Sequence, residues 1–168
     1  MKATEDIFRA YDIRGVYGEE LDAEIGERVG LAFGNYLGKH HESGKISIGC
    51  DARVSSPELQ LAVSKGVSRA GFDVDIVGMV PIPVANYFTW KSNLNSDEYV
   101  AGIYITASHN PAQWNALKLL NSRGEFISAE DGKQLLQIAE GDDIHFATVN
   151  ELGEVTHDDT WIEKHIDA

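Results

Sequence analysis

A serine and a histidine are adjacent in the hexapeptide Thr-Ala-Ser-His-Asn-Pro at 106–111, directly after the apolar run Tyr99–Ile105. The apolar run is typical of a buried strand, and Asn-Pro is a turn signal. A hydroxyl nucleophile, Ser108, is therefore expected on an exposed loop at the carboxyl end of a strand, which is where open α/β sheets bind ligands. The alternative is that Ser108 only caps a following helix.

The chemistry open to Ser108 depends on its neighbours. A phosphoryl group that moves between hydroxyls needs a resting place, in-line geometry and cations that stabilise its charge. His109 and Lys118 are the candidate proton-transfer groups; the alternatives are a loop histidine with local hydrogen bonds and a solvated strand lysine. Serine hydrolysis is not favoured, because the sequence has no Gly-x-Ser-x-Gly elbow and places no acidic partner.

The chain carries a formal net charge of −13 over 168 residues. An acidic domain repels nucleic-acid phosphates and anionic lipids, and no cluster of Lys and Arg offsets the repulsion. Nucleic acid is therefore not expected as a partner. A phosphorylated ligand would have to be attracted by locally placed cations, and Arg14, Arg53 and Lys118 are the candidates.

The composition, with 43% hydrophobic and 24% charged residues, predicts a globular domain. No apolar run is long enough to cross a bilayer, and the first residues lack the apolar stretch of a signal peptide. Cys50 is the single cysteine, so no internal disulfide can form. We expect a cytoplasmic protein without a membrane partner.

Strand and helix patterns alternate along the chain, which favours a layered α/β fold. Strands are predicted at 46–50, 73–77, 99–105 and 116–120. Helices are predicted from the Asp22 cap to Leu37, from the Ser56 cap with Pro57 at its first position to Gly71, from Pro83 through Trp90, from Ser128 to Ala139, and at 160–166. Glycines every four residues in the first of these helices, at 26, 30, 34 and 38, predict close packing against the sheet or a neighbour.

The loop at 106–111, followed by Asn115 and Lys118, resembles the phosphoserine loop of the α-D-phosphohexomutases. The resemblance extends, in the family's order, to Phe8–Gly15, to Gly49–Arg53 with the Ser-Ser-Pro that follows, and to Val80–Pro83. The first of these segments is similar to the opening of the phosphomannomutase/phosphoglucomutase branch. A phosphoglucosamine mutase-type substrate is the alternative within the family.

The resemblance implies a three-layer α/β/α sandwich with a mixed, mainly parallel sheet. It also implies an isomerase that interconverts hexose 1-phosphate and 6-phosphate, with hexose 1,6-bisphosphate as activator and a Mg²⁺ ion that Ser108 helps to hold. The catalytic residues that it implies are Ser108, His109, Lys118 and Arg14. The residues implied to bind substrate or phosphate are Tyr11, Arg14, Thr106, Asn110 and Asn115.

The family spreads its active site over four domains, and this chain resembles only the first. Its metal loop, Asp-Gly-Asp-Gly-Asp, and its sugar-reading loop are absent from the sequence. We expect residues 1–155 to form the first domain and 156–168 to lead toward the second. The expected partners are a phosphorylated hexose and the remaining mutase domains; alone, the chain is expected to be inactive and to bind Mg²⁺ weakly. The alternative function is a non-catalytic binding or interaction domain that keeps the fold.

Overall fold

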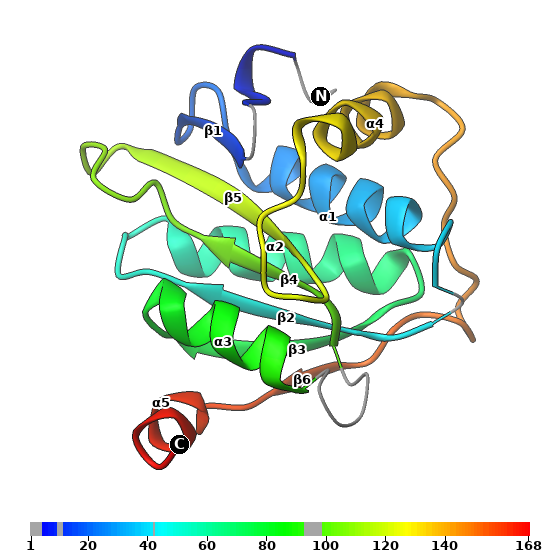
Figure 1. Cartoon of the computed structure of the whole chain (residues 1–168). Helices are drawn as coiled ribbons and strands as arrows, with labels where there is room; N and C mark the ends of the chain where they lie inside the picture. Colours follow the sequence, from blue (N-terminus) through cyan, green and yellow to red (C-terminus); the bar gives the residue numbers. More distant parts are fainter. Residues whose placement is uncertain (1–4, 10–11, 42, 93–98) are drawn as a thin grey trace.

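The computed structural model describes residues 5–9, 12–41, 43–92 and 99–168, in which helices and strands alternate (Figure 1). The helices are α1 (Ala23–Leu37), α2 (Ser56–Arg69), α3 (Ile82–Ser92), α4 (Ala129–Glu140) and α5 (Trp161–Ile166), with a short 3-10 turn at Glu5–Ile7. The strands are β1 (Asp12–Val16), β2 (Lys45–Cys50), β3 (Asp73–Met79), β4 (Tyr99–Ile105), β5 (Trp114–Asn121) and β6 (Val155–His157).

These strands form one mixed sheet in the order β1-β5-β4-β2-β3-β6. β2 pairs in parallel with both β4 and β3, and β3 pairs in parallel with β6. β5 runs antiparallel to both of its neighbours, β1 and β4. A sheet with one reversed strand and helices on both faces confirms the predicted α/β/α sandwich with a mixed, mainly parallel sheet.

The two faces of the sheet are covered by different helices. α1 and α2 pack on one face, with α4 beside α1, and α3 packs on the other face, with α5 beside α3. Ile13 and Leu117 belong to the larger core under α1 and α2, whereas Tyr104 belongs to the smaller core on the α3 side. Tyr104 and Asp12 are both cross-strand partners of Lys118. Since cross-strand partners point to the same face, all three side chains lie on the α3 side of the sheet.

α1 and α2 meet along glycines of both helices. A Cβ at Gly30 would lie 2.3 Å from the carbonyl oxygen of Val63, and a Cβ at Gly66 would lie 2.0 Å from the carbonyl oxygen of Glu27. Backbones approach this closely only where a side chain is missing. The close packing predicted from the glycine spacing is confirmed, and the neighbour is α2.

Local capping fixes the starts of two helices as the sequence predicted. The Asp22 side chain caps α1, and Ser128 and Asp131 form a reciprocal capping box at the start of α4. In the described part of the chain, no helix combines the length and the apolar character that crossing a membrane requires.

The sheet also contains two strands that no sequence pattern predicted, β1 and the shorter β6. β6 lies beside β3, with Val155 opposite Val74. Trp161 of α5 is 2% exposed and packs in the core on the α3 side. The predicted domain boundary after residue 155 therefore falls inside β6.

Candidate functional site

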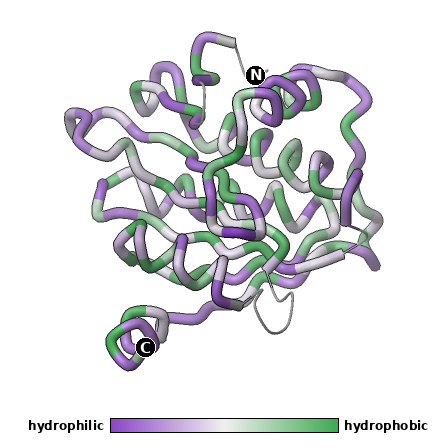
Figure 2. Tube along the Cα trace, in the orientation of Figure 1, coloured by the Kyte–Doolittle hydropathy of each residue, from purple (hydrophilic) through white to green (hydrophobic). Residues whose placement is uncertain are grey.

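The loops that follow β2 and β4 lie together at one edge of the sheet (Figure 1). Cys50, at the end of β2, is the parallel-pairing partner of Ile105, at the end of β4. The two strands therefore place Asp51 and Thr106 side by side, at the edge where such sheets bind ligands. The loop after β4 returns into β5, and its tip is hydrophilic (Figure 2).

Ser108 is exposed on this loop and has a backbone φ of 57°. No other non-glycine residue in the described ranges has a positive φ. This conformation costs a residue with a side chain about 1 kcal/mol, and strained backbone of this kind clusters at functional sites. The chain after Ser108 passes into β5 and not into a helix, so Ser108 is not a helix cap.

Asp51 anchors the loop from the β2 side. Its Oδ2 accepts a hydrogen bond from the Thr106 hydroxyl at 2.6 Å, and the same hydroxyl accepts from the Ser108 amide at 3.0 Å. Burial acts to raise the pKa of Asp51, but the hydrogen bonds from Thr106, Ser56 and Arg53 and the Arg53 charge outweigh it and lower the pKa. The ionised carboxylate thus supports the backbone of Ser108 through Thr106.

Arg53 holds the same loop from inside. Its Nε donates to Asp51 at 3.0 Å, and Nη1 and Nη2 each donate to two carbonyl oxygens at 2.8–3.0 Å. The four carbonyl oxygens belong to Ser108, Asn110, Pro111 and Trp114. All five N–H donors of a guanidinium are then used. Arg53 therefore has no N–H donor left for direct contact with a phosphorylated ligand, because its donors bind the loop. That its positive charge attracts such a ligand stays a prediction.

Asn115 joins β5 to the start of α2. It is fully buried, its Nδ2 donates to the hydroxyls of Ser55 at 2.9 Å and Ser56 at 3.0 Å, and its Oδ1 accepts from the Ala116 amide. The N-cap of α2 is Ser55, not the predicted Ser56, and it makes no side-chain cap bond. The Ser56 hydroxyl is used elsewhere, because it donates to Asp51 at 2.7 Å.

Arg14, on β1, reaches the Ser108 loop from the other side. Its Nη1 donates to Asn110 Oδ1 at 2.7 Å, and its Nη2 donates to Asp12 Oδ2 at 2.5 Å. Its Nε is buried and has no partner among the described residues. A buried N–H without an acceptor is rare. The Nε of Arg14 is thus an unusual donor that the described protein atoms do not use.

Lys118 is buried, with 6% of its surface exposed. Its ammonium donates to Asp12 Oδ2 at 2.9 Å and lies 5.1 Å from the centroid of the Phe126 ring. The alternative of a solvated strand lysine is wrong. Asp12 thus binds both Arg14 and Lys118, a role that no pattern in the sequence indicated.

His109 and Ser108 are close but are not a tight pair. The distance between Ser108 Oγ and His109 Nδ1 is 3.4 Å, which is long for a hydrogen bond from a hydroxyl to a ring nitrogen. Both residues are exposed. Tyr11, the remaining residue predicted for this site, lies outside the described residues.

The residues around Ser108 do not by themselves form a magnesium site. Within the described ranges, no group of three or more His, Cys, Asp or Glu side chains could hold a metal ion. The Asp51 carboxylate is already bonded to Thr106, Ser56 and Arg53. Ser108 is the only oxygen ligand for Mg²⁺ that was predicted here, and one oxygen falls well short of the six that Mg²⁺ prefers.

The fold and the loop define an α/β/α domain that presents an exposed, conformationally fixed serine at the carboxyl ends of two parallel strands. The comparisons with known proteins identify its family. The family model described as "Phosphoglucomutase/phosphomannomutase, alpha/beta/alpha domain I" matches residues 5–145, and the chain belongs to this family.

Relatives of known name agree with this assignment. A probable phosphoglucosamine mutase of Methanosphaera stadtmanae is 35% identical over 99% of this chain and 35% of its own length. A phosphomannomutase of Klebsiella pneumoniae is 37% identical over 77% of each chain. The crystal structure of a phosphoglucomutase/phosphomannomutase family protein of Burkholderia thailandensis superposes with a TM-score of 0.79 at 31% identity, covering 98% of this chain and 35% of that one.

The chain spans about a third of the length of the first relatives that it matches, with shares of 35% and 33%. The match covers the domain that carries Ser108.

Proposed function

We propose that this chain is the phosphoserine-bearing first domain of a phosphohexomutase, an isomerase that interconverts hexose 1-phosphate and hexose 6-phosphate. Ser108 would accept the phosphoryl group and return it. The observation that carries this proposal is the exposed Ser108 hydroxyl on a loop that Thr106 and Arg53 hold at a φ of 57°. Phosphoryl transfer depends mostly on positioning and electrostatics, and a fixed acceptor loop supplies the positioning.

In the proposed step, Ser108 Oγ forms a bond to phosphorus while the bond between that phosphorus and a sugar oxygen breaks. The serine hydroxyl loses its proton, and the departing sugar oxygen gains one. The reverse transfer, to the other sugar hydroxyl, restores the serine. His109, at 3.4 Å from Ser108 Oγ, and Lys118 are the proposed proton-transfer groups.

Arg14 is the proposed phosphate-binding residue of this domain. Two of its nitrogens are bonded to Asn110 and Asp12, and its Nε has no acceptor among the described residues. The side chains of Thr106, Asn110 and Asn115 make hydrogen bonds to protein atoms. These bonds support a role in fixing the loop, and not a role in direct phosphate binding. Tyr11 remains a proposed lining residue on the strength of the family resemblance.

Mg²⁺, when bound, would neutralise charge on the phosphoryl oxygens. Ser108 is the one ligand that this domain is proposed to offer, so the other ligands must come from elsewhere in a longer protein. The proposed partners are accordingly a phosphorylated hexose and the remaining mutase domains, and the proposed phosphoryl donor is hexose 1,6-bisphosphate. The proposed location is the cytoplasm.

The sugar is proposed only as a class. Relatives named phosphoglucosamine mutase and phosphomannomutase match at 35% and 37% identity. Such similar values do not favour one hexose over another. A non-catalytic domain that keeps the fold is the second candidate, and phosphorylation of Ser108 distinguishes the two.

The test uses the native-length protein that carries this domain, incubated with hexose 1,6-bisphosphate and Mg²⁺. Intact-mass analysis and peptide mapping should place one phosphate on Ser108, and the Ser108→Ala variant should take up none on that peptide. Phosphate on the same peptide of the alanine variant, or no phosphate on the wild type, would contradict the proposal.

The 168-residue chain alone should fold but should show no measurable interconversion of hexose 1-phosphate and 6-phosphate. A cooperative thermal melt would show that the chain folds, and a coupled mutase assay would measure the interconversion. Turnover by the chain alone would require a complete site within these residues.

A further inference from the structure

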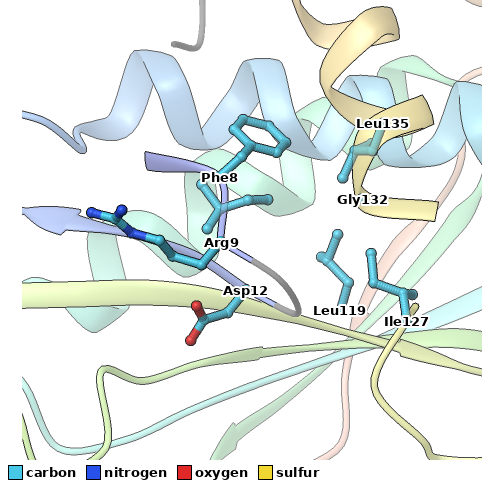
Figure 3. A pocket seen from close by; sticks show the side chains of 8 residues that line it. Phe8, Arg9, Asp12, Leu119, Ile127, Gly132 and Leu135 are labelled. Atoms are coloured by element: carbon cyan, nitrogen blue, oxygen red, sulfur yellow. The ribbon is translucent and has the colours of Figure 1, made fainter. Parts of the chain in front are cut away.

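One carboxylate oxygen connects the two cations beside the Ser108 loop. Asp12 Oδ2 accepts from Lys118 Nζ at 2.9 Å and from Arg14 Nη2 at 2.5 Å. Asp12 is 5% exposed, and its side chain points away from the apolar residues of the nearby pocket, including Leu119 and Ile127 (Figure 3). The carboxylate therefore lies on the polar side of β1, between the two cations.

This arrangement continues into the loop. Arg14 uses its other terminal nitrogen to donate to Asn110 Oδ1 at 2.7 Å, and Asn110 is two residues from Ser108. A single chain of contacts thus runs from Lys118 through Asp12 and Arg14 to the loop that presents the serine. A shift of the Asp12 carboxylate would move both cations relative to Ser108.

Charge explains why a carboxylate is needed at this position. Lys118 and Arg14 are both largely buried, and like charges in a poorly solvated place repel each other strongly. Asp12 offsets one of the two positive charges and leaves a net positive charge of one on the three side chains.

We infer that Asp12 is a positioning residue for phosphoryl transfer: its carboxylate sets the places of Lys118 and Arg14 relative to Ser108. The inference rests on the proposed function, and it goes further because it assigns a role to a residue outside the predicted site. Asp12 does not contact the reacting atoms in this role. It acts through the two cations and through Asn110.

The competing explanation is that Asp12 only neutralises a buried lysine and so contributes to stability. Asp75 provides a matched control, because it is also a strand aspartate with 5% exposure. Its partners are the Tyr99 hydroxyl at 2.6 Å and the Thr156 hydroxyl at 3.2 Å, and it lies on β3, which three strands separate from β1. Asp75→Asn removes a buried carboxylate without touching the Ser108 loop.

The kinetic test compares Asp12→Asn, Asp12→Glu and Asp75→Asn in the native-length protein. We expect Asp12→Asn to lower kcat about tenfold or more, Asp12→Glu to lower it less, and Asp75→Asn to leave it within about twofold. Thermal melts of all three report stability separately. Equal kcat for Asp12→Asn and wild type, or a loss of kcat in Asp75→Asn that matches the loss in Asp12→Asn, would overturn the inference.

If Asp12→Asn fails to fold, Asp12→Glu decides, because it keeps the charge and moves the carboxylate by one methylene. A lower kcat at a near wild-type melting temperature supports positioning, and an unchanged kcat reduces Asp12 to a structural ion pair. Failure of the proposed function has a different signature: wild-type Ser108 then takes up no phosphate, whatever Asp12 does.

An experiment on the 168-residue chain tests the contact chain without any catalytic readout. In amide NMR spectra, Asp12→Glu should shift the signals of Ser108 and Asn110, whereas Asp75→Asn should leave them in place. Unmoved loop signals in the Asp12→Glu spectrum would contradict the coupling between β1 and the loop.

Discussion

The guanidinium of Arg53 donates to the backbone carbonyl oxygen of Ser108 at 2.8 Å, so the serine is held by its main chain and its side chain remains exposed. The same guanidinium binds three further carbonyl oxygens of the loop. A planar fork with five donors can make these contacts, and an ammonium cannot.

Arg53→Lys should therefore lower the rate of Ser108 phosphorylation by about tenfold to a hundredfold, because the charge is kept but the loop loses most of its contacts. Rapid-quench measurements of phosphoserine formation in the native-length protein check this. Arg69→Lys is the control, since Arg69 pairs with Glu27 on the surface and is 42% exposed. Equal rates for Arg53→Lys and wild type would show that the loop keeps its shape without the guanidinium.

Ser108→Gly should be more stable than Ser108→Ala. Both variants lack the hydroxyl, but glycine adopts a φ of 57° without strain, whereas alanine pays for its Cβ. The expected difference in the free energy of unfolding is about 1 kcal/mol, from chemical denaturation of the two variants. Equal stabilities would mean that the loop relaxes when the serine is replaced.

Lys118→Ala should lower turnover about a hundredfold or more if Lys118 transfers protons or stabilises phosphoryl charge. Steady-state kinetics of the native-length protein measure the effect. Lys133→Ala is a fitting control, because Lys133 is a surface lysine paired with Glu130 at 3.7 Å. Near-unchanged kinetics for Lys118→Ala would limit Lys118 to a structural ion pair with Asp12.

Gly132→Ala should stabilise the protein by about 0.5–1 kcal/mol, because glycine is a poor residue inside a helix. A Cβ at Gly132 would meet no atom within 4 Å, and the residue lines the small apolar pocket between α4 and the sheet (Figure 3). Gly66→Ala should destabilise the protein by about 1–3 kcal/mol, because its Cβ would collide with the backbone of α1. Thermal melts of the two variants should move in opposite directions.

Acid should weaken the attachment of α5 through Asp158. Burial acts to raise the pKa of Asp158, but hydrogen bonds from Lys164 and Thr160 outweigh it and lower the pKa to about 2. A carboxyl whose pKa is lower in the folded state stabilises above its unfolded pKa, about 4, and this contribution is lost as the pH falls toward 2.

We expect the Asp158 carboxylate to contribute about 1–2 kcal/mol to the free energy of unfolding at pH 5. This is less than the full pKa shift of Asp158 would give, because Lys164 is 53% exposed and solvent screens the pair. Urea unfolding of wild type and Asp158→Asn should differ by this amount at pH 5 and converge near pH 2. A constant difference across this range would exclude the carboxylate as its source.

Much of the fold could be predicted because its signals are local. The Asp22 cap, the Ser128–Asp131 capping box and the apolar run Tyr99–Ile105 each appear in a few consecutive residues, and the structure contains the elements they predict. β6 could not be predicted in this way. Its three residues are too few for an alternating pattern, and it becomes a strand only by pairing with β3.

The residues alone pointed to a candidate site only within one segment, and Arg14, which reaches Asn110 from β1, was added by the family resemblance. Ser108 and His109 were identified from a single loop. The use of Arg53 depends on carbonyl groups more than fifty residues away, and the link between Asp12 and Lys118 depends on the register of β1 against β5. Contacts between residues so far apart leave no pattern along the sequence. Arg53 was therefore expected only to attract a phosphorylated ligand by its charge, and no pattern pointed to Asp12.

The short strand β6 has a consequence for where this unit can be cut. β3 pairs with β2 on one side, and Val155–His157 cover part of its other side. A chain ending at residue 145, where the family match ends, would leave the outer side of β3 without a partner strand and would remove Trp161 from the α3-side core. Unpaired strand edges join other chains, so such a shortened protein should self-associate. We therefore expect the smallest unit that stays monomeric to extend past Trp161, beyond the residues that the family model matches.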